Sequence, residues 1–168
     1  MVRHFGTISS LTDVVPSIGA PFPETERYDY TRRSLVAGIV LYLSCPFIDP
    51  PKEKYVIAAA IGDPPLLILV NSRIHPFIQS RPLLLECQVS LAVSKYPFLR
   101  HDSYANCARV FDEMPEKEVL EQLATDPKRI IMRLDPESRK QILSAVGKAR
   151  TVSPSHARRI LESLSESD

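Results

Sequence analysis

The sequence contains no long hydrophobic run. Its longest apolar stretch covers only residues 64–70, whereas a membrane-spanning helix needs about 20 predominantly apolar residues. The first ten residues also lack the apolar core of a signal peptide. We therefore expect no membrane partner and a cytoplasmic location.

Cysteine and glycine are scarce, and the histidines are scattered. The three cysteines, Cys45, Cys87 and Cys107, are odd in number and widely spaced, which argues against a disulfide framework and against a zinc site. We expect buried free thiols instead. The five glycines form no phosphate-binding loop, and the four histidines have no metal-ligand spacing. We therefore expect no metal and no cofactor.

The chain also lacks an excess of charge of either sign. It has 21 basic and 20 acidic residues, and a net charge of +1 does not by itself indicate a protein that binds polyanions. Its 168 residues, 44% hydrophobic and 24% charged, are typical of one globular domain. A core of that size needs no disulfide or metal to stabilise it.

Apolar and β-branched segments predict a central sheet. The expected strands are residues 36–44, 55–61, 66–71 and 87–93. A short turn separates the second strand from the third, so these two form an antiparallel hairpin. The first three strands are apolar almost throughout, which predicts burial on both faces, as in a small closed barrel or a sheet covered by helices. Three prolines in residues 45–54 predict an exposed, unpaired loop.

The remainder divides into an arm and a helical third. Residues 1–33 are interrupted by prolines and predict a flexible N-terminal arm, residues 34–112 form the β-barrel domain, and residues 113–168 form helices packed on the barrel. Asp135 and Ser153 each precede a proline and are suitable helix N-caps. The predicted fold class is α+β, with a small, mainly antiparallel barrel and C-terminal helices.

Two polar segments are candidates for a functional site. Residues 100–104, in a loop predicted over residues 96–107, combine a guanidinium, an imidazole, a carboxylate and two hydroxyls, which together can bind an anion and transfer protons. The alternative is that Asp102 and Ser103 satisfy backbone groups in a tight turn. Residues 71–75 follow the most apolar strand, where a rigid element positions polar groups well.

The second segment, residues 71–75, also has an alternative to a functional role: Ser72 caps a helix and Arg73 is solvated.

A short fifth strand is expected over residues 108–111, outside the two polar segments.

Four segments occur in an order that is typical of a known family. Residues 36–43 look like its first strand, and residues 67–74 are similar to its apolar strand that closes in a serine-containing pair. Residues 101–110 look like its aspartate-containing segment before the last strand, and residues 133–137 are similar to the start of its C-terminal helix. In this order the chain resembles the MazF/PemK-like toxin family, whose members have a small SH3-like barrel.

The resemblance implies a metal-independent endoribonuclease that cleaves single-stranded RNA, forms a homodimer and is neutralised by an antitoxin protein. In that chemistry the ribose 2′-hydroxyl attacks the adjacent phosphate, which requires a base, an acid and a cation. By position, Ser72 matches the family's active-site hydroxyl. Lys54 and Arg73 are the expected phosphate-binding cations, and His101 is the expected proton carrier with Asp102 as its orienting group.

One family feature is replaced in this chain. Residues 53–55 stand where the family has an arginine–proline pair, and the Lys54 ammonium cannot form the bidentate fork of a guanidinium. This replacement favours an alternative function, a non-catalytic barrel of the same kind that binds a protein partner or nucleic acid. An unrelated α+β domain is a further alternative.

Overall fold

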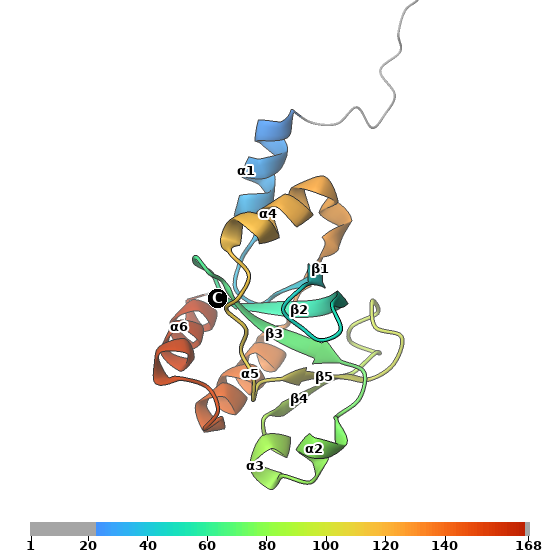
Figure 1. The fold of residues 1–168 in the computed structure, drawn as a ribbon, viewed down its shortest axis with the longest axis vertical. Coiled ribbons are helices and arrows are strands. Elements are labelled where there is room, and N and C mark those ends of the chain that lie inside the picture. The colour runs from blue at the N-terminus through green and yellow to red at the C-terminus, as the bar shows by residue number, and fades with distance from the viewer. Residues whose placement is uncertain (1–22, 167–168) are drawn as a thin grey trace, which may run out of the picture.

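The computed structural model describes residues 23–166 and shows one curled antiparallel sheet with helices on both of its faces (Figure 1). Its six strands have the order β4-β5-β3-β2-β1-β6, so β4 and β6 are the edges of a half-barrel. The strands are β1 Ile39–Cys45, β2 Lys52–Ala60, β3 Leu66–Asn71, β4 Gln88–Leu91, β5 Ser103–Asn106 and β6 Ile130–Arg133. The helices are α1 Glu24–Ser34, α2 Pro76–Gln79, α3 Pro82–Leu85, α4 Glu116–Thr125, the 3₁₀ turn η1 Pro127–Arg129, α5 Pro136–Lys148 and α6 Pro154–Ser165.

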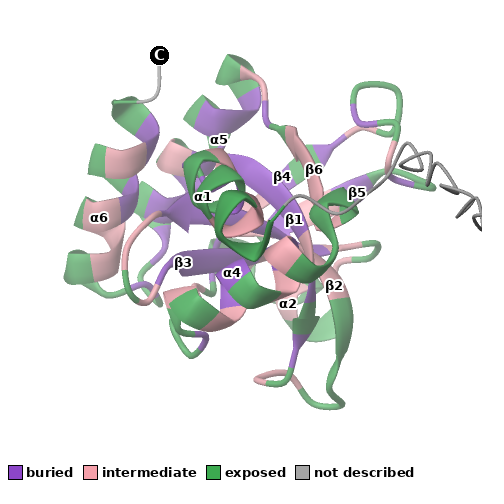
Figure 2. Cartoon of the chain, turned by 90° about the horizontal axis from the view of Figure 1, so that it is seen from above, coloured by how far each residue is buried: buried purple, intermediate pink, exposed green. Residues whose placement is uncertain are grey.

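The sheet separates two hydrophobic layers, because successive strand residues point to opposite faces. On one face Ile57 and Ile68 belong to the cluster that includes α5 and α6, and on the other Leu41 and Val56 belong to the cluster that includes α4. Figure 2 shows the buried residues concentrated in the strands and on the inner sides of the surrounding helices. Burial on both faces, predicted from the apolar composition of the first strands, is therefore confirmed.

The predicted hairpin is confirmed, but its first strand begins earlier than expected. β2 and β3 are antiparallel neighbours, with Val56 opposite Leu69. Lys52, Glu53 and Lys54 pair with β1, although the loop prediction for residues 45–54 had left them unpaired. That prediction is wrong for these three residues and for Cys45, which pairs with Lys52 at the end of β1. The prolines that interrupt pairing lie only at positions 46, 50 and 51, and the residues before and after them have a backbone N–H to donate.

Two short strands correct the prediction further. β5 lies inside the segment predicted as a loop, and it pairs with both β3 and β4. Residues 108–111, predicted as a fifth strand, contribute only an isolated bridge between Phe111 and Leu67. β6 was not predicted, and it extends the sheet on the outer side of β1. Each of these strands has only four residues, so pairing with distant partners decides its conformation.

The two predicted helix starts are confirmed. Asp135 Oδ1 accepts a hydrogen bond from the Ser138 backbone N–H at 2.8 Å, and α5 follows directly. Ser153 Oγ accepts one from the His156 backbone N–H at 3.2 Å at the start of α6. Each cap satisfies a donor that the first turn of a helix leaves free.

Residues 24–33, predicted to be part of a flexible arm, instead form most of α1. This helix lies beside α4 at one end of the molecule (Figure 1). Its Thr31 is fully buried, and Tyr28 packs against the hydrophobic layer under α4. Burial of one helix face therefore orders a segment whose prolines and polar residues indicated an arm. Residues 1–22 of the predicted arm lie outside the described residues.

The three cysteines are buried free thiols, as predicted. Burial raises the pKa of Cys45 to about 11, which keeps that thiol protonated near neutral pH.

Candidate functional site

The candidate site lies where β2 begins and β3 ends. Lys54 and Asn71 are cross-strand neighbours there, and Lys54 Nζ donates a hydrogen bond to Asn71 Oδ1 at 2.7 Å. Burial, together with the nearby positive charge of Lys52, lowers the pKa of Lys54. Ser72 follows the last residue of β3 and is exposed. Two rigid strands thus present a half-buried ammonium group and a hydroxyl at one end of the sheet.

A pocket of about 240 Å³ opens at this end of the sheet. It combines Lys54 and Ser72 with Arg100 and His101 from the facing loop. Two cations, a hydroxyl and an imidazole from three separate segments therefore line one cavity. We call it the aromatic pocket, and it is lined by Tyr42, Glu53, Lys54, Tyr55, Val70, Ser72, Phe98, Leu99, Arg100, His101 and Ser103.

Aromatic rings form one wall of this pocket. The Tyr42 and Tyr55 ring centroids are 4.9 Å apart, and those of Tyr55 and Phe98 are also 4.9 Å apart. The register of β1 on β2 places Tyr42 opposite Tyr55, and the Tyr55 hydroxyl donates to the Phe98 carbonyl at 3.5 Å. Burial, with the neighbouring Glu53 carboxylate, raises the pKa of Tyr42. The wall therefore offers neutral ring surface next to the cations.

The loop that carries His101 is fixed to α5. The hydroxyl of the fully buried Tyr96 donates to Asp135 Oδ2 at 2.8 Å and shares a hydrogen bond with Ser138 Oγ at 2.6 Å. Lys95 Nζ lies 2.7 Å from Asp135 Oδ2. Burial alone would raise the pKa of Asp135, but hydrogen bonds from Lys95, the Ser138 N–H and Tyr96 outweigh it and hold this pKa well below its usual range. The carboxylate is therefore ionised and holds the loop in place.

The structure brings three of the five sequence-predicted site residues into the aromatic pocket: Lys54, Ser72 and His101. Asp102 does not line it. Its Oδ1 accepts a hydrogen bond from the Val93 N–H at 2.9 Å, and the Ser103 hydroxyl donates to the His101 carbonyl at 3.0 Å. These bonds fit the alternative stated above, in which Asp102 and Ser103 satisfy backbone groups of the loop. A role for Asp102 in orienting His101 stays a prediction.

Arg73 lies in an adjoining cavity of about 780 Å³, which shares Lys54 and Ser72 with the aromatic pocket. The helix cap expected at Ser72 belongs instead to His75, whose Nδ1 accepts from the Phe77 N–H at 3.1 Å. We call this cavity the polar groove, and it is lined by Lys52, Lys54, Asn71, Ser72, Arg73, Ile74, His75, Pro76, Ile78, Gln79, Gln88, Tyr104 and Asn106.

Sequence reasoning missed the aromatic wall and the amide side chains of the groove. The cross-strand pairs Tyr42–Tyr55 and Gln88–Asn106 become neighbours only through strand register. A sequence signal that could have indicated this face is the alternation of polar with apolar or small side chains in residues 88–91 and 103–106. In the structure one set of alternate residues is buried and the other set forms the polar face.

No protein-family model matches the chain, and no curated protein matches it. Within residues 23–166, no group of three or more histidine, cysteine, aspartate or glutamate side chains is placed to hold a metal ion. In the same part of the chain, no helix has the length and apolar character needed to cross a membrane.

Proposed function

We propose that the chain is a metal-independent endoribonuclease that binds single-stranded RNA in the aromatic pocket. One observation carries the proposal: Lys54, Ser72, Arg100 and His101 meet in one cavity beside aromatic rings. The toxin-like character, the SH3-like identity of the half-barrel and the cytoplasmic location belong to the same proposal. They are supported by the order of sequence segments that resembles MazF/PemK-like toxins.

The chemistry follows from the groups in the pocket. The ribose 2′-oxygen attacks the adjacent phosphorus, and His101 takes the proton that the hydroxyl loses. Lys54 and Arg100 meet the charge that develops on the phosphate oxygens, and Ser72 orients the phosphate by a hydrogen bond. The bond from phosphorus to the 5′-oxygen breaks, which leaves a 2′,3′-cyclic phosphate. The leaving 5′-oxygen takes a proton from water, and the hydroxide that remains takes back the proton held by His101, which is exposed to solvent.

Cleavage of a long single-stranded RNA in the presence of EDTA tests this proposal. We expect products that end in a 5′-hydroxyl, and no cleavage where a 2′-deoxyribose replaces the ribose at the scissile position. His101→Ala should slow cleavage by about 100-fold or more, as loss of an acid–base group typically does.

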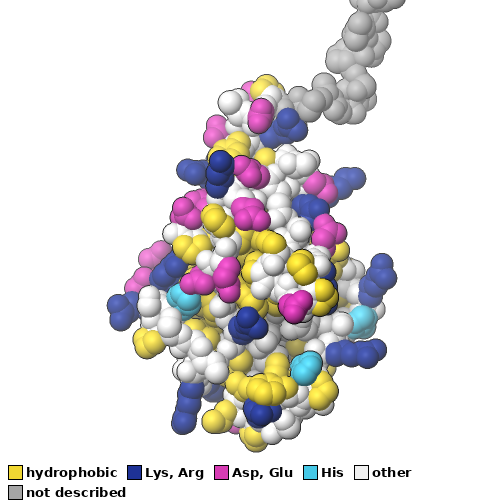
Figure 3. Space-filling model, in the orientation of Figure 1, with side chains coloured by type: hydrophobic (Ala, Val, Ile, Leu, Met, Phe, Trp, Pro, Cys, Tyr) yellow, Lys and Arg dark blue, Asp and Glu magenta, His cyan; other side chains and the backbone are white. Residues whose placement is uncertain are grey.

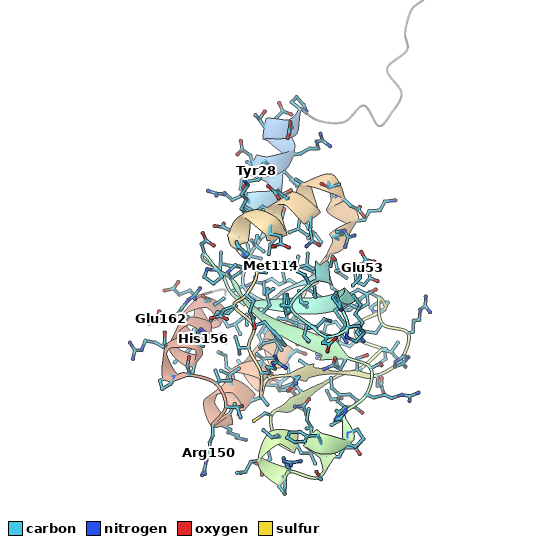
Figure 4. The ribbon with its side chains drawn as sticks, in the orientation of Figure 1. Tyr28, Glu53, Met114, Arg150, His156 and Glu162 are labelled. Carbon is cyan, nitrogen blue, oxygen red and sulfur yellow. The ribbon has the colours of Figure 1, made fainter. Side chains whose placement is uncertain are left out.

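The matched control is His156→Ala. His156 lies on α6, across the molecule from Glu53 at the start of β2, and pairs with Asp112 at 3.3 Å (Figure 4). Equal rates for the parent and His101→Ala, or cleavage of the deoxy-substituted RNA, would contradict the assigned mechanism.

A second candidate function is binding without cleavage. The hydrogen bond from Val93 to Asp102 favours it, because this carboxylate serves the turn rather than the imidazole. A lysine in place of an arginine at position 54 favours it as well. Retention of RNA by the parent protein with no cleavage would support this function over the first.

A protein contact, with a second copy or an antitoxin, is part of the proposal. Three large apolar side chains on α2 and α3 are exposed, Phe77 by 53%, Leu83 by 57% and Leu85 by 40%. Large apolar groups gathered at a surface often mark interaction sites. We expect a homodimer by light scattering at tens of micromolar, and a strictly monomeric mass would count against it.

A further inference from the structure

Strand register places a row of polar side chains along the polar groove. Asn71 lies directly opposite Tyr104, and Tyr104 lies directly opposite Ser90. The hydrogen bond from Lys54 to Asn71 extends this row onto β2. Directly paired residues point to the same face of a sheet, so the half-buried Tyr104 ring lies between an amide and a small hydroxyl.

An amide pair with a fixed orientation lies beside this ring. Gln88 is paired with Asn106, and its Nε2 donates to Asn106 Oδ1 at 2.8 Å and to the Leu84 carbonyl at 3.2 Å. Asn106 Oδ1 also accepts from the Ala108 N–H at 3.3 Å. These bonds leave the Asn106 amide protons and Gln88 Oε1 as a donor and an acceptor. The edge of a nucleobase offers the complementary groups.

The charge around this row of side chains suits a polyanion. Lys52, Lys54, Arg73 and His75 line the groove, and none of the described residues that line it is acidic. In Figure 3 acidic and basic side chains are mixed over the upper and middle parts of the molecule, whereas basic side chains predominate over acidic ones in the lower part, near α2. An acidic peptide would meet this charge, but it would make no use of an aromatic ring beside an oriented amide pair.

We propose that Tyr104 is the stacking platform for one nucleobase of a single-stranded nucleic acid, with Gln88 and Asn106 at the base edge and Lys52 and Arg73 at flanking phosphates. This inference rests on the proposed RNA-binding function. Because the groove shares Lys54 and Ser72 with the aromatic pocket, a strand with its scissile phosphate in the pocket continues into the groove. The nucleotide on Tyr104 is then a neighbour of the cleaved one.

Fluorescence anisotropy with 2′-O-methyl oligonucleotides tests the platform without cleavage. A short fluorescein-labelled oligonucleotide is compared with one of equal length that is abasic throughout. Base stacking on an aromatic side chain strengthens binding by about fivefold to 150-fold per base, so the parent protein should prefer the base-containing strand at least about fivefold. This comparison needs no variant to fold.

Variants then locate the preference. Tyr104→Leu should reduce it by about fivefold or more, because other bases still meet the rings of the aromatic pocket, whereas Tyr104→Phe, which keeps the ring, should retain it. Tyr30→Leu is the matched control, since Tyr30 is 58% exposed on α1, away from the groove. Equal affinity of the parent for both strands, or an unchanged preference in Tyr104→Leu, overturns the inference.

Parallel assays with cleavable RNA separate this inference from the proposed function. Cleavage by a protein that binds both 2′-O-methyl strands equally overturns the platform and leaves the ribonuclease in place. A preference that depends on Tyr104, without any cleavage, supports the platform and overturns the ribonuclease. Binding to neither strand, together with no cleavage, overturns both.

Discussion

Replacing Tyr96 with phenylalanine tests how the loop that carries His101 is held. The change keeps the buried ring, which is only 1% exposed, and removes the hydroxyl that bonds to Asp135 and Ser138. A hydrogen bond to a charged group contributes about 1.5–3 kcal/mol and a neutral one about 0.5–1.5 kcal/mol. Asp135 keeps its contacts with Lys95 and the Ser138 N–H, so we expect a loss at the low end, about 1.5–2 kcal/mol.

Urea unfolding measures this loss as a lower midpoint with an unchanged slope. Tyr30→Phe is the matched control, because the exposed ring of Tyr30 makes its change a surface substitution, expected within about 0.5 kcal/mol. Tyr96→Leu should cost more than Tyr96→Phe, because it also removes buried ring atoms. If Tyr96→Phe unfolds within about 0.5 kcal/mol of the parent, the hydroxyl does not anchor the loop, and the argument from these hydrogen bonds fails.

Two further predictions concern the same framework. The lowered pKa of Asp135 means that its carboxylate stabilises the fold above the unfolded pKa of about 3.9, and that this contribution is lost as the pH falls toward the folded pKa. Asp135→Asn keeps an N-cap residue but removes the charge, so this variant should be less stable than the parent at pH 7. In thermal melts it should also lose less stability than the parent between pH 7 and pH 3. Gly38→Ala should lower the free energy of unfolding by about 1–3 kcal/mol, because φ is +84° there and a Cβ would lie 2.9 Å from Arg139 Cδ. Gly147→Ala in α5, where a Cβ meets nothing within 4 Å, should instead raise it by about 0.5–1 kcal/mol. Equal effects of the two substitutions in urea unfolding would contradict both reasons.

The central strands were predictable because their signal is local. Ile57 and Ile68 lie in apolar runs that only burial explains, and a short turn fixes which strands are neighbours. Asp135 and Ser153 were equally readable, since an N-cap acts on the N–H group three residues later in the chain.

The short strands were not predictable in the same way. Ile130–Arg133 has only four residues and becomes β6 because the outer side of β1 offers free backbone groups. Ser103–Asn106 was hidden in a polar segment, because only alternate side chains face the core there. In both cases the sheet, rather than local propensity, selects the extended conformation.

The candidate site shows the same division at the level of side chains. His101 and Asp102 are adjacent in sequence, and their types alone indicated a proton-carrying pair. In the structure the two side chains have different surroundings: His101 lines the aromatic pocket, whereas Asp102 accepts a hydrogen bond from the Val93 N–H. Tyr104 was counted in the candidate segment only for its hydroxyl, yet register places its ring between residues of β3 and β4, which are far apart in the sequence. Two residues that are neighbours in a polar loop are therefore less certain to share a site than two residues on the same face of a sheet. Which residues share a face depends on strand pairings that a local sequence pattern does not specify.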